Sequence, residues 1–422
     1  AVVEHASPPM TDVPAANDLP TPPCAEPLAS AARGFVSPLH SGLDLPRYHA
    51  THVLAAVFPF TAGLALYGWR AAATVAATMA SAAAGLVLWR RVGARGRQLR
   101  LTQALWFALL LGLMLPAHLF SRVDAGGYPG VAEGIGAAWP ILIGAGLVLV
   151  ALLWALGGLG AGRVHPVLVT YLLIAALFAP ALTPHRILQR DHLVTGDLFA
   201  TPPPAPTPAS TEPWVRATPP GGGDAQWVEP AAAELSAFTR GTESQDRYFL
   251  TLDVLLRDRM PTLEDLIVAG QPGGIGTSSV IAVIIGGLFL LYRGMIDFRV
   301  PLVVFAVAYV ALVLLPVPVV LSDRAEYRWL ALRSVGWPTA LTFVHYELLA
   351  GPLAFVAFFL ATAPNIRPLV RRARTTYAAL VGLLAAVMQL YVSVSFGAYV
   401  ALLLASLVTP LIDKWRRPKP LV

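Results

Sequence analysis

The sequence predicts an all-α polytopic membrane protein, and three observations lead to that fold class. Of the 422 residues, 56% are hydrophobic and 13% are charged, whereas soluble domains carry about a quarter charged residues. The mean hydropathy is +0.64. From Ala50 onward, apolar stretches of about 20 residues recur, and each is long enough to cross roughly 30 Å of hydrocarbon.

The chain divides into five parts by composition. We predict a flexible N-terminal tail (1–46), a first membrane repeat (47–182), a Pro-rich linker with short helices (183–274), a second membrane repeat (275–413) and a basic tail (414–422). The first part lacks the basic start and apolar core of a signal peptide. The predicted spans are 50–68, 71–90, 101–120, 138–159, 165–182, 275–293, 300–320, 339–362, 376–395 and 397–412.

The long hydrophilic segment changes character along its length. The run "TPPPAPTPASTEP" cannot pack a core, so residues 201–223 are predicted to form an extended linker. Further on, "LEDLIVAG" places Leu263, Leu266 and Ile267 on one helical face, with Gly270 as the predicted C-cap. We expect one or two short amphipathic helices there.

The basic residues predict the orientation of the chain in the membrane. The two ends of the chain and the short loops on the same side hold eighteen Arg and Lys, against five in the short loops opposite. Positive charge accumulates in cytoplasmic loops, so both termini are predicted to be cytoplasmic and 183–274 extracytoplasmic. Five spans before the long segment and five after it predict an inverted 5+5 repeat.

Several function classes find no support in the sequence. The formal charge of +6 marks cytoplasmic loops rather than a nucleic-acid surface. The single cysteine, Cys24, excludes an internal disulfide and an iron–sulfur cluster ligated by four Cys of this chain. His49 and His52 share a helix face but have no third ligand, so no metal site is predicted. No catalytic nucleophile and base are recognisable, nor is a phosphate-loop or dinucleotide fingerprint.

Four separated segments resemble one family of membrane proteins. They are "SPLHSGLDLPRYHATHVLAAVFPFTAGLALYGWRAA", "GGIGTSSVIAVIIGGLFLLYRGMIDFRVPL", "LLAGPLAFVAFFLATAPNIRPL" and "FGAYVALLLASLVTPLID". In this order they are similar to the D subunit of the Rnf electron-transport complex and the B subunit of the sodium-pumping NADH:quinone oxidoreductase. The resemblance implies a urea-transporter-like fold, a flavin cofactor, a bacterial inner-membrane location, and other membrane and peripheral subunits as partners.

The chain departs from the family at its flavin motifs. The family joins FMN through a phosphoester to the Thr of Ser-Gly-Ala-Thr, and only Thr262 of that motif is present here. Its Gly-Glu-Thr-Ser is replaced by Gly276, Thr277, Ser278 and Ser279, and its Ala-Thr-Asp-Pro has become "ATAP". Covalent FMN at Thr262, noncovalent FMN, and riboflavin or another flavin all remain open.

Each candidate site residue has a functional and a structural interpretation. The small residues Gly276 to Ser279 either approach a flavin or let helices pack closely. Glu347, an acid within a span, either lies on an ion pathway or pairs with Arg324, Arg328 or Arg333. Asp297, between Arg293 and Arg299, is interpreted as part of a loop ion pair. Thr262 would cap a helix if it carries no flavin.

Two functions follow from the sequence. The leading hypothesis is a membrane subunit of an Rnf-type or NADH:quinone-type complex, which passes electrons through flavin and couples them to Na⁺ or H⁺ movement. The alternative is a redox-inactive scaffold or ion-conducting subunit of such a complex that has lost the covalent flavin.

Overall fold

The computed structural model describes most of the membrane part of the chain. By its internal contacts the chain divides into residues 1–37 and residues 38–422, and the described residues all lie in the second unit. They are 45–91, 100–120, 135–156, 164–178, 182, 187–189, 215–216, 226–228, 231–240, 252, 255–256, 260, 263–268, 273–321, 324–329, 336–368 and 370–415.

One group of helices comes from the first half of the chain. Its members are α2 (Leu45–Tyr67), α3 (Trp69–Arg91), α4 (Leu101–Met114), the short η1 (Ala117–Phe120), α5 (Ile135–Ala155) and α6 (Pro166–Leu177). Gly68, with φ +62°, makes the turn between α2 and α3. Helix α3 packs against α4 and α5, and α6 also packs against both of them.

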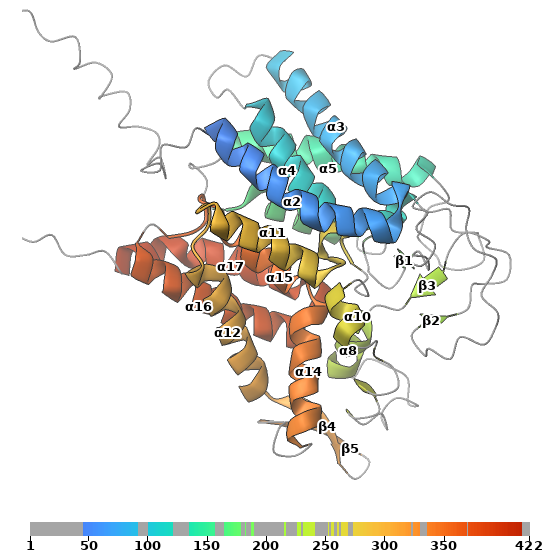
Figure 1. Cartoon of the computed structure of the whole chain (residues 1–422), viewed down its shortest axis with the longest axis vertical. Coiled ribbons are helices and arrows are strands. Elements are labelled where there is room, and N and C mark those ends of the chain that lie inside the picture. Colours follow the sequence, from blue (N-terminus) through green and yellow to red (C-terminus); the bar gives the residue numbers. More distant parts are fainter. Residues whose placement is uncertain are drawn as a thin grey trace, which may run out of the picture. The chain divides into compact units, whose positions relative to one another are not determined.

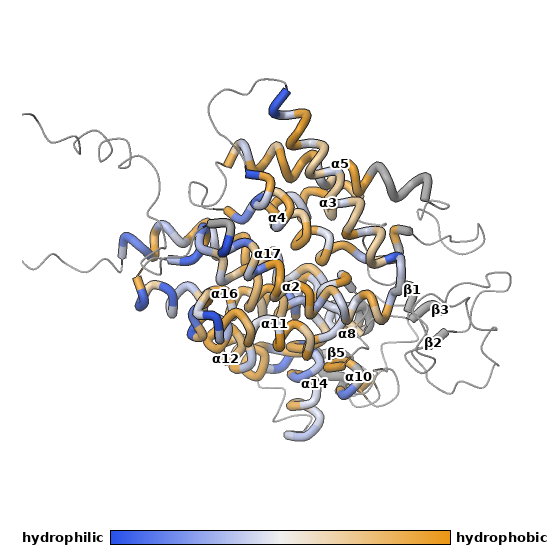
Figure 2. The backbone as a smooth tube through the Cα atoms, turned by 45° about the horizontal axis from the view of Figure 1, so that its top comes forward, coloured by the Kyte–Doolittle hydropathy of each residue, from blue (hydrophilic) through white to orange (hydrophobic). Residues whose placement is uncertain are grey.

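The second group comes from the other half of the chain, drawn in yellow to red in Figure 1. It consists of α11 (Val280–Tyr292), α12 (Arg299–Leu314), α14 (Trp337–Ala350), α15 (Leu353–Phe355), the π-helical turn η6 (Val356–Leu360), α16 (Arg371–Tyr391) and α17 (Val394–Trp415). Helix α16 packs between α12 and α17. The described helices are mainly apolar, and hydrophilic residues colour several of their ends in Figure 2.

The two groups meet along α2 and α11. Pro59 lies inside α2, so it provides no N–H for the carbonyl of Ala55, four residues earlier. Gly286 of α11 packs there, and a Cβ on it would come within 2.7 Å of the Ala55 oxygen. A glycine is therefore needed opposite the interrupted turn of α2.

All ten predicted spans overlap helices, and helical membrane architecture is confirmed. Within the described part, four helices are long and apolar enough to cross a bilayer, namely α2, α3, α16 and α17. A fifth span is obtained if the bent pair formed by α14 and the 353–360 helix counts as one. Helices α4, α6, α11 and α12 have only 14, 12, 13 and 16 residues. The ten-span 5+5 repeat stays a prediction.

Three predicted spans are shorter or less straight than expected, for one shared reason. Helix α4 ends before Pro116, α12 ends before Pro316, and α14 ends before Pro352. Each preceding residue, Leu115, Leu315 or Gly351, has an extended backbone. Proline disfavours helical geometry in the residue before it. The segments predicted as 101–120, 300–320 and 339–362 are therefore corrected, and the last of them bends by 60°.

The segment between the two groups contains short helices and strands. The strands β1 (Ile187–Gln189), β2 (Val215–Arg216) and β3 (Gln226–Val228) form an antiparallel sheet in the order β1-β3-β2. The predicted linker is thus extended at its described residues, but these residues pair with β3. The expected short helices are α8 (Ala231–Arg240) and α10 (Leu263–Val268).

The segment is fastened to the second group of helices. Helix α8 packs against α14, α16 and α17, and the Ser236 hydroxyl accepts a hydrogen bond from the backbone N–H of Val394 at 3.0 Å. The hairpin of β4 (Val317–Leu321) and β5 (Arg324–Arg328) adds a contact, because the Tyr327 hydroxyl donates to the Thr239 carbonyl.

Candidate functional site

Two interrupted helices meet at one point, which we call the junction. The end of α4 and the end of α14 both reach it, together with α6, α17 and the segment 273–279, which we call the mouth. A small cavity there is lined by Met114, Pro116, Tyr171, Leu182, Gly273, Gly274, Thr277, Ala350, Pro352, Ser395 and Tyr399. Its volume is about 20 Å³, which is room for one water molecule or an ion of similar size.

The hydroxyl groups of the mouth bond to backbone atoms of the mouth or of the first turn of α11. Thr277 donates to the Gly274 carbonyl at 3.0 Å, and Ser278 donates to the Ile275 carbonyl at 2.8 Å. Ser279 is the N-cap of α11, and its hydroxyl accepts from the Ala282 N–H at 3.4 Å. All three side chains are buried. They shape the turn that starts α11.

The glycines of the mouth lie directly against protein. The Ile275 N–H donates to the Leu115 carbonyl at 3.0 Å, and Pro116 and Gly274 form a β-bridge. A Cβ on Gly274 would come within 2.6 Å of the Met114 oxygen. A Cβ on Gly276 would lie 2.8 Å from Leu113 Cβ and 3.3 Å from Phe355 Cε2, so this glycine touches both interrupted segments.

These contacts test how the mouth would fit a flavin. Ligand pockets for organic molecules have about 300–1,000 Å³, and the junction cavity has about 20 Å³. The described residues of the mouth therefore do not enclose an isoalloxazine ring. Thr262 lies outside the described residues, one position before α10 begins at Leu263. Gly270, the predicted C-cap, also lies outside them.

Glu347 is the buried acid of the interrupted segment. It lies on α14 with no exposed surface, and neither carboxylate oxygen has a hydrogen-bond partner among the described residues. Among the described residues, the predicted pairing with Arg328 is not found. The side chain of Arg324 and the whole of Arg333 lie outside the described part. Glu347 and Ala350 are three residues apart, which places them on the same helix face. Ala350 lines the junction cavity.

Gln389 is a second buried polar side chain beside the same break. It lies on α16 with no exposed surface, and its amide nitrogen and oxygen both lack a partner within the described part. A Cβ on Gly351 would clash with its Nε2 atom. Gln389 therefore faces the break between α14 and α15. Sequence reasoning missed it, although a lone amide within the apolar "AAVMQLYV" is a usable signal.

The histidines singled out in the sequence pack as aromatic rings. His49 stacks on Trp106 with ring centroids 5.6 Å apart, and His52 meets the same ring edge-on at 5.3 Å. The His52 Nδ1 atom lies 3.0 Å from the Tyr48 carbonyl oxygen. Among the residues described, no three His, Cys, Asp or Glu side chains gather as metal ligands would.

Asp297 forms an ion pair, but with a different partner from those its sequence neighbours suggested. Its Oδ2 atom lies 3.3 Å from Nη1 of Arg374, at the start of α16. Its Oδ1 atom accepts a hydrogen bond from the backbone N–H of Arg299 at 3.2 Å. The acid thus joins the start of α12 to α16. The two residues are 77 positions apart, so no local sequence pattern indicates the pair.

Fold and site together define a helical membrane protein with interrupted helices that meet inside it. Such breaks are typical of membrane proteins that move ions or small solutes. The chain belongs to the NQR2, RnfD, RnfE family, whose sequence model matches residues 36–421.

Named relatives agree with this family. The chain is 25% identical to the D subunit of the ion-translocating oxidoreductase complex of Aeromonas hydrophila, over 87% of this chain and 91% of the relative. Identity to the D subunit of the same complex in Aeromonas salmonicida is 26%, over 67% and 71%. The D subunit of the Na⁺-translocating ferredoxin:NAD⁺ oxidoreductase complex of Acetobacterium woodii is 28% identical, over 38% and 43%.

Proposed function

We propose that this chain is the D-type membrane subunit of an ion-translocating oxidoreductase complex, and that a cation, Na⁺ or H⁺, passes through the junction. The observation that carries the proposal is the meeting of two interrupted helices beside a buried acid that has no partner among the described residues. In transporters with repeated halves, interrupted segments in corresponding positions mark the binding site. Helices α4 and α14 belong to the third and eighth predicted spans, which correspond in a 5+5 repeat.

The chemistry of the junction suits a cation better than a large ligand. Its cavity is sized for one water molecule, and backbone carbonyls freed at helix ends can coordinate Na⁺. The Glu347 carboxylate would supply negative charge one helical turn away. For H⁺, the same carboxylate would take up and release the proton. An acid in a membrane segment without a partner among the described residues is costly, so its presence there supports a role in transport.

The partners and location of the chain follow from the same proposal. Its relatives are named as subunits of a complex, so further membrane and peripheral subunits are expected. The test is purification of the full-length chain from native membranes with its associated subunits. Membrane vesicles from cells lacking the chain should lose ion uptake driven by the electron donor, and the restored chain should recover it. Uptake that persists without the chain contradicts the proposal.

Orientation is the second part of the proposal, and it rests on the distribution of Arg and Lys. In a chain whose Cys24 is replaced by Ser, we expect a cysteine at position 221 to react with an impermeant reagent in intact cells. A cysteine at position 96 should not react. Labelling at position 96 would reverse the assigned orientation.

Flavin attachment is a separable part of the proposal, and it concerns Thr262. FMN supplies one-electron and two-electron redox chemistry when it is bound, and the described mouth does not enclose its ring. Intact-mass measurement of the chain from its native host decides attachment. A mass excess of FMN less water, absent in Thr262→Ala, supports it, and an unmodified wild-type chain contradicts it.

One observation favours the alternative function, an ion-conducting or scaffold subunit without covalent flavin. In the mouth, which resembles the family's flavin segment, the hydroxyl groups are hydrogen-bonded and neighbouring residues lie against Gly274 and Gly276. In-gel fluorescence of the denatured chain separates the two functions. Fluorescence lost in Thr262→Ala supports the redox subunit, whereas a dark wild-type chain that still supports ion uptake supports the alternative.

A further inference from the structure

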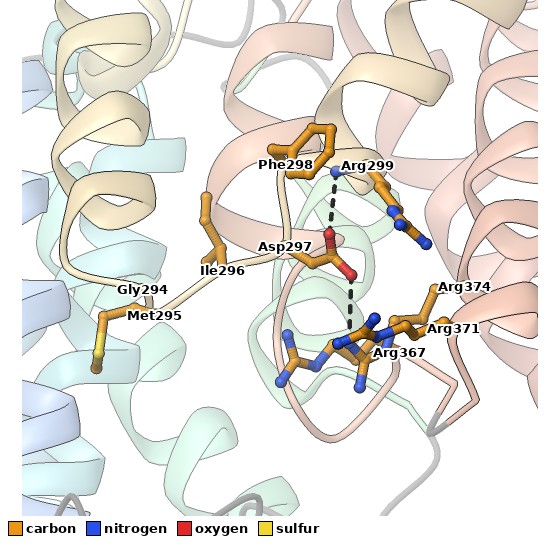
Figure 3. A pocket seen from close by; sticks show the side chains of 9 residues that line it. All are labelled: Gly294, Met295, Ile296, Asp297, Phe298, Arg299, Arg367, Arg371 and Arg374. Carbon is orange, nitrogen blue, oxygen red and sulfur yellow. Dashed lines mark hydrogen bonds and ion pairs between the residues drawn. The ribbon is translucent and has the colours of Figure 1, made fainter. Parts of the chain in front are cut away.

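A cavity lined by arginines lies away from the junction, where α11 ends and where α12 and α16 begin. We call it the arginine cavity (Figure 3). Its lining residues are Gly294, Met295, Ile296, Asp297, Phe298, Arg299, Arg367, Arg371 and Arg374, and its volume is about 320 Å³. Four guanidinium groups face one carboxylate, which leaves a net charge of +3.

The loop between α11 and α12 gives the cavity a defined wall. Gly294 has φ +67°, and the N–H groups of Gly294 and Met295 bond to the carbonyls of Leu291 and Leu290. This is a Schellman ending of α11. The loop then presents Asp297, whose two oxygens are engaged by the Arg299 N–H and by Arg374. The single acid is therefore already paired.

Among the described residues, no second acid lines the cavity to match the remaining arginines. In the described part of the chain, no hydrogen bond or ion pair engages the guanidinium of Arg367, which is partly buried. Burial, followed by repulsion from Arg374, lowers the pKa of Arg367, although an arginine keeps its charge at neutral pH. Figure 3 shows the guanidinium groups of Arg367, Arg371 and Arg374 close together below Asp297.

Two helices begin at this cavity with arginines instead of acids. Helix α12 starts at Arg299 and α16 at Arg371, and neither has an acidic residue in its first turn. The positive end of a helix dipole favours an anion there. A preference for basic residues on the cytoplasmic side explains exposed arginines such as Arg372, but not three segments that gather arginines around a cavity.

The surroundings of the cavity indicate which kind of molecule carries the anion that binds there. Phe298 lines it and is 56% exposed, and Leu302, one turn further along α12, is 61% exposed. An apolar, exposed helix flank therefore leads away from a positive cavity at the end of a membrane helix. Basic pockets in this position bind the headgroups of anionic lipids.

We infer that the arginine cavity binds the phosphate group of an anionic phospholipid, whose acyl chains lie along the exposed flank of α12. Guanidinium groups of Arg367, Arg371 and Arg299 would hold the phosphate oxygens, because planar guanidinium groups match them in geometry. Arg374 and Asp297 would position the two helix starts around the headgroup.

The test uses the full-length chain, purified with the subunits that remain bound to it, in mild detergent. Phosphatidylglycerol, phosphatidylcholine or inorganic phosphate is added separately, and retention is measured by native mass spectrometry together with the shift in melting temperature. The variants are Arg367→Gln and Arg371→Gln. Arg372→Gln, an exposed neighbour outside the cavity, is the matched control.

We expect wild type and Arg372→Gln to retain phosphatidylglycerol but not phosphatidylcholine. Each cavity variant should bind it about tenfold more weakly, the loss of one charge-assisted hydrogen bond. The exposed Arg371 keeps the test valid if Arg367→Gln does not fold. Equal retention by wild type and both cavity variants overturns the inference. It is also overturned if inorganic phosphate alone gives the same variant-dependent stabilisation, or if lipid binds only after the other subunits are stripped away.

Discussion

The breaks after α4 and after α14 follow the same local rule but leave different surroundings. After α4, the Leu115 carbonyl accepts a hydrogen bond from the Ile275 N–H of the mouth, and Pro116 forms a β-bridge with Gly274. The backbone beyond the helix end is therefore hydrogen-bonded to the mouth. Beside the break after α14, Glu347 and Gln389 are buried without partners among the described residues.

Under the proposed function, this difference separates a break that serves packing from one that would serve transport. A satisfied break holds its neighbours in one arrangement, because each polar group already has its partner. A break with unmet polar groups carries a cost that an ion or water can relieve. If a cation passes through the junction as proposed, the mouth would form the scaffold of the site and the α14 side would supply its chemistry.

The largest effect is expected from adding a side-chain atom at Gly274, which packs against the break after α4. In Gly274→Ala, the new Cβ would lie 2.6 Å from the Met114 oxygen, which is backbone and cannot move aside cheaply. We expect a destabilisation of about 2 kcal/mol or more, measured as a lower melting temperature. Gly144→Ala is the control, because a Cβ there meets nothing within 4 Å. A normal melting temperature for Gly274→Ala would mean that the mouth is not closely packed.

Removing a buried polar group beside the break after α14 should stabilise the protein instead of destabilising it. Gln389→Leu replaces a buried amide without described partners by an apolar side chain of similar size. We expect the free energy of unfolding to stay the same or to increase by up to about 2 kcal/mol, measured as an equal or higher melting temperature. A marked loss of stability would show that Gln389 has a structural partner, and the comparison of the two breaks would fail.

A moderate effect is expected where α8 docks on the second helix group. Ser236→Ala removes the acceptor of the buried Val394 N–H, which should cost about 1–2 kcal/mol. Thermal unfolding of the variant measures this cost. No change would mean that water or another group replaces the hydroxyl.

A smaller effect is expected at the start of α11. Ser279→Ala removes the N-cap acceptor of the Ala282 N–H, a long hydrogen bond of 3.4 Å. The expected cost is about 0.5–1 kcal/mol. A loss of flavin or of ion uptake without a matching loss of stability would instead assign a ligand to this hydroxyl.

The smallest effect is expected from shortening the Pro-rich stretch. Deletion of residues 203–222 removes β2, which pairs with β3 over only two residues. We expect assembly and melting temperature to change little. Failure of the chain to assemble would show that this stretch docks on a neighbour.

Apolar length and charge were enough to predict a helical membrane protein, and the motifs were enough to predict the family. The helix ends were harder, because apolar runs continue through Pro116, Pro316 and Pro352 while the helix does not. These three prolines do carry the missing signal. Pro59 and Pro410 show why it is ambiguous, since both lie inside helices.

Long-range partners could not be predicted. The sequence suggested that Asp297 pairs with a neighbour in its loop, whereas its partner Arg374 is 77 positions away. The mouth was correctly picked out as a place of close backbone approach, but only its packing against Leu113 and Phe355 shows what approaches it. Pairing of distant side chains depends on tertiary packing, which a single sequence does not specify.

Glu347 provides the most direct test of cation passage through the junction. Donor-driven Na⁺ and H⁺ uptake is measured in vesicles containing the whole complex, with Glu347→Gln compared with wild type and Glu347→Asp. We expect Glu347→Gln to lose uptake while its melting temperature stays the same or rises, because a buried carboxylate without a described partner is replaced by a neutral amide of the same shape. Glu347→Asp should retain part of the uptake. Wild-type uptake of both ions by a stably folded Glu347→Gln complex would contradict the account.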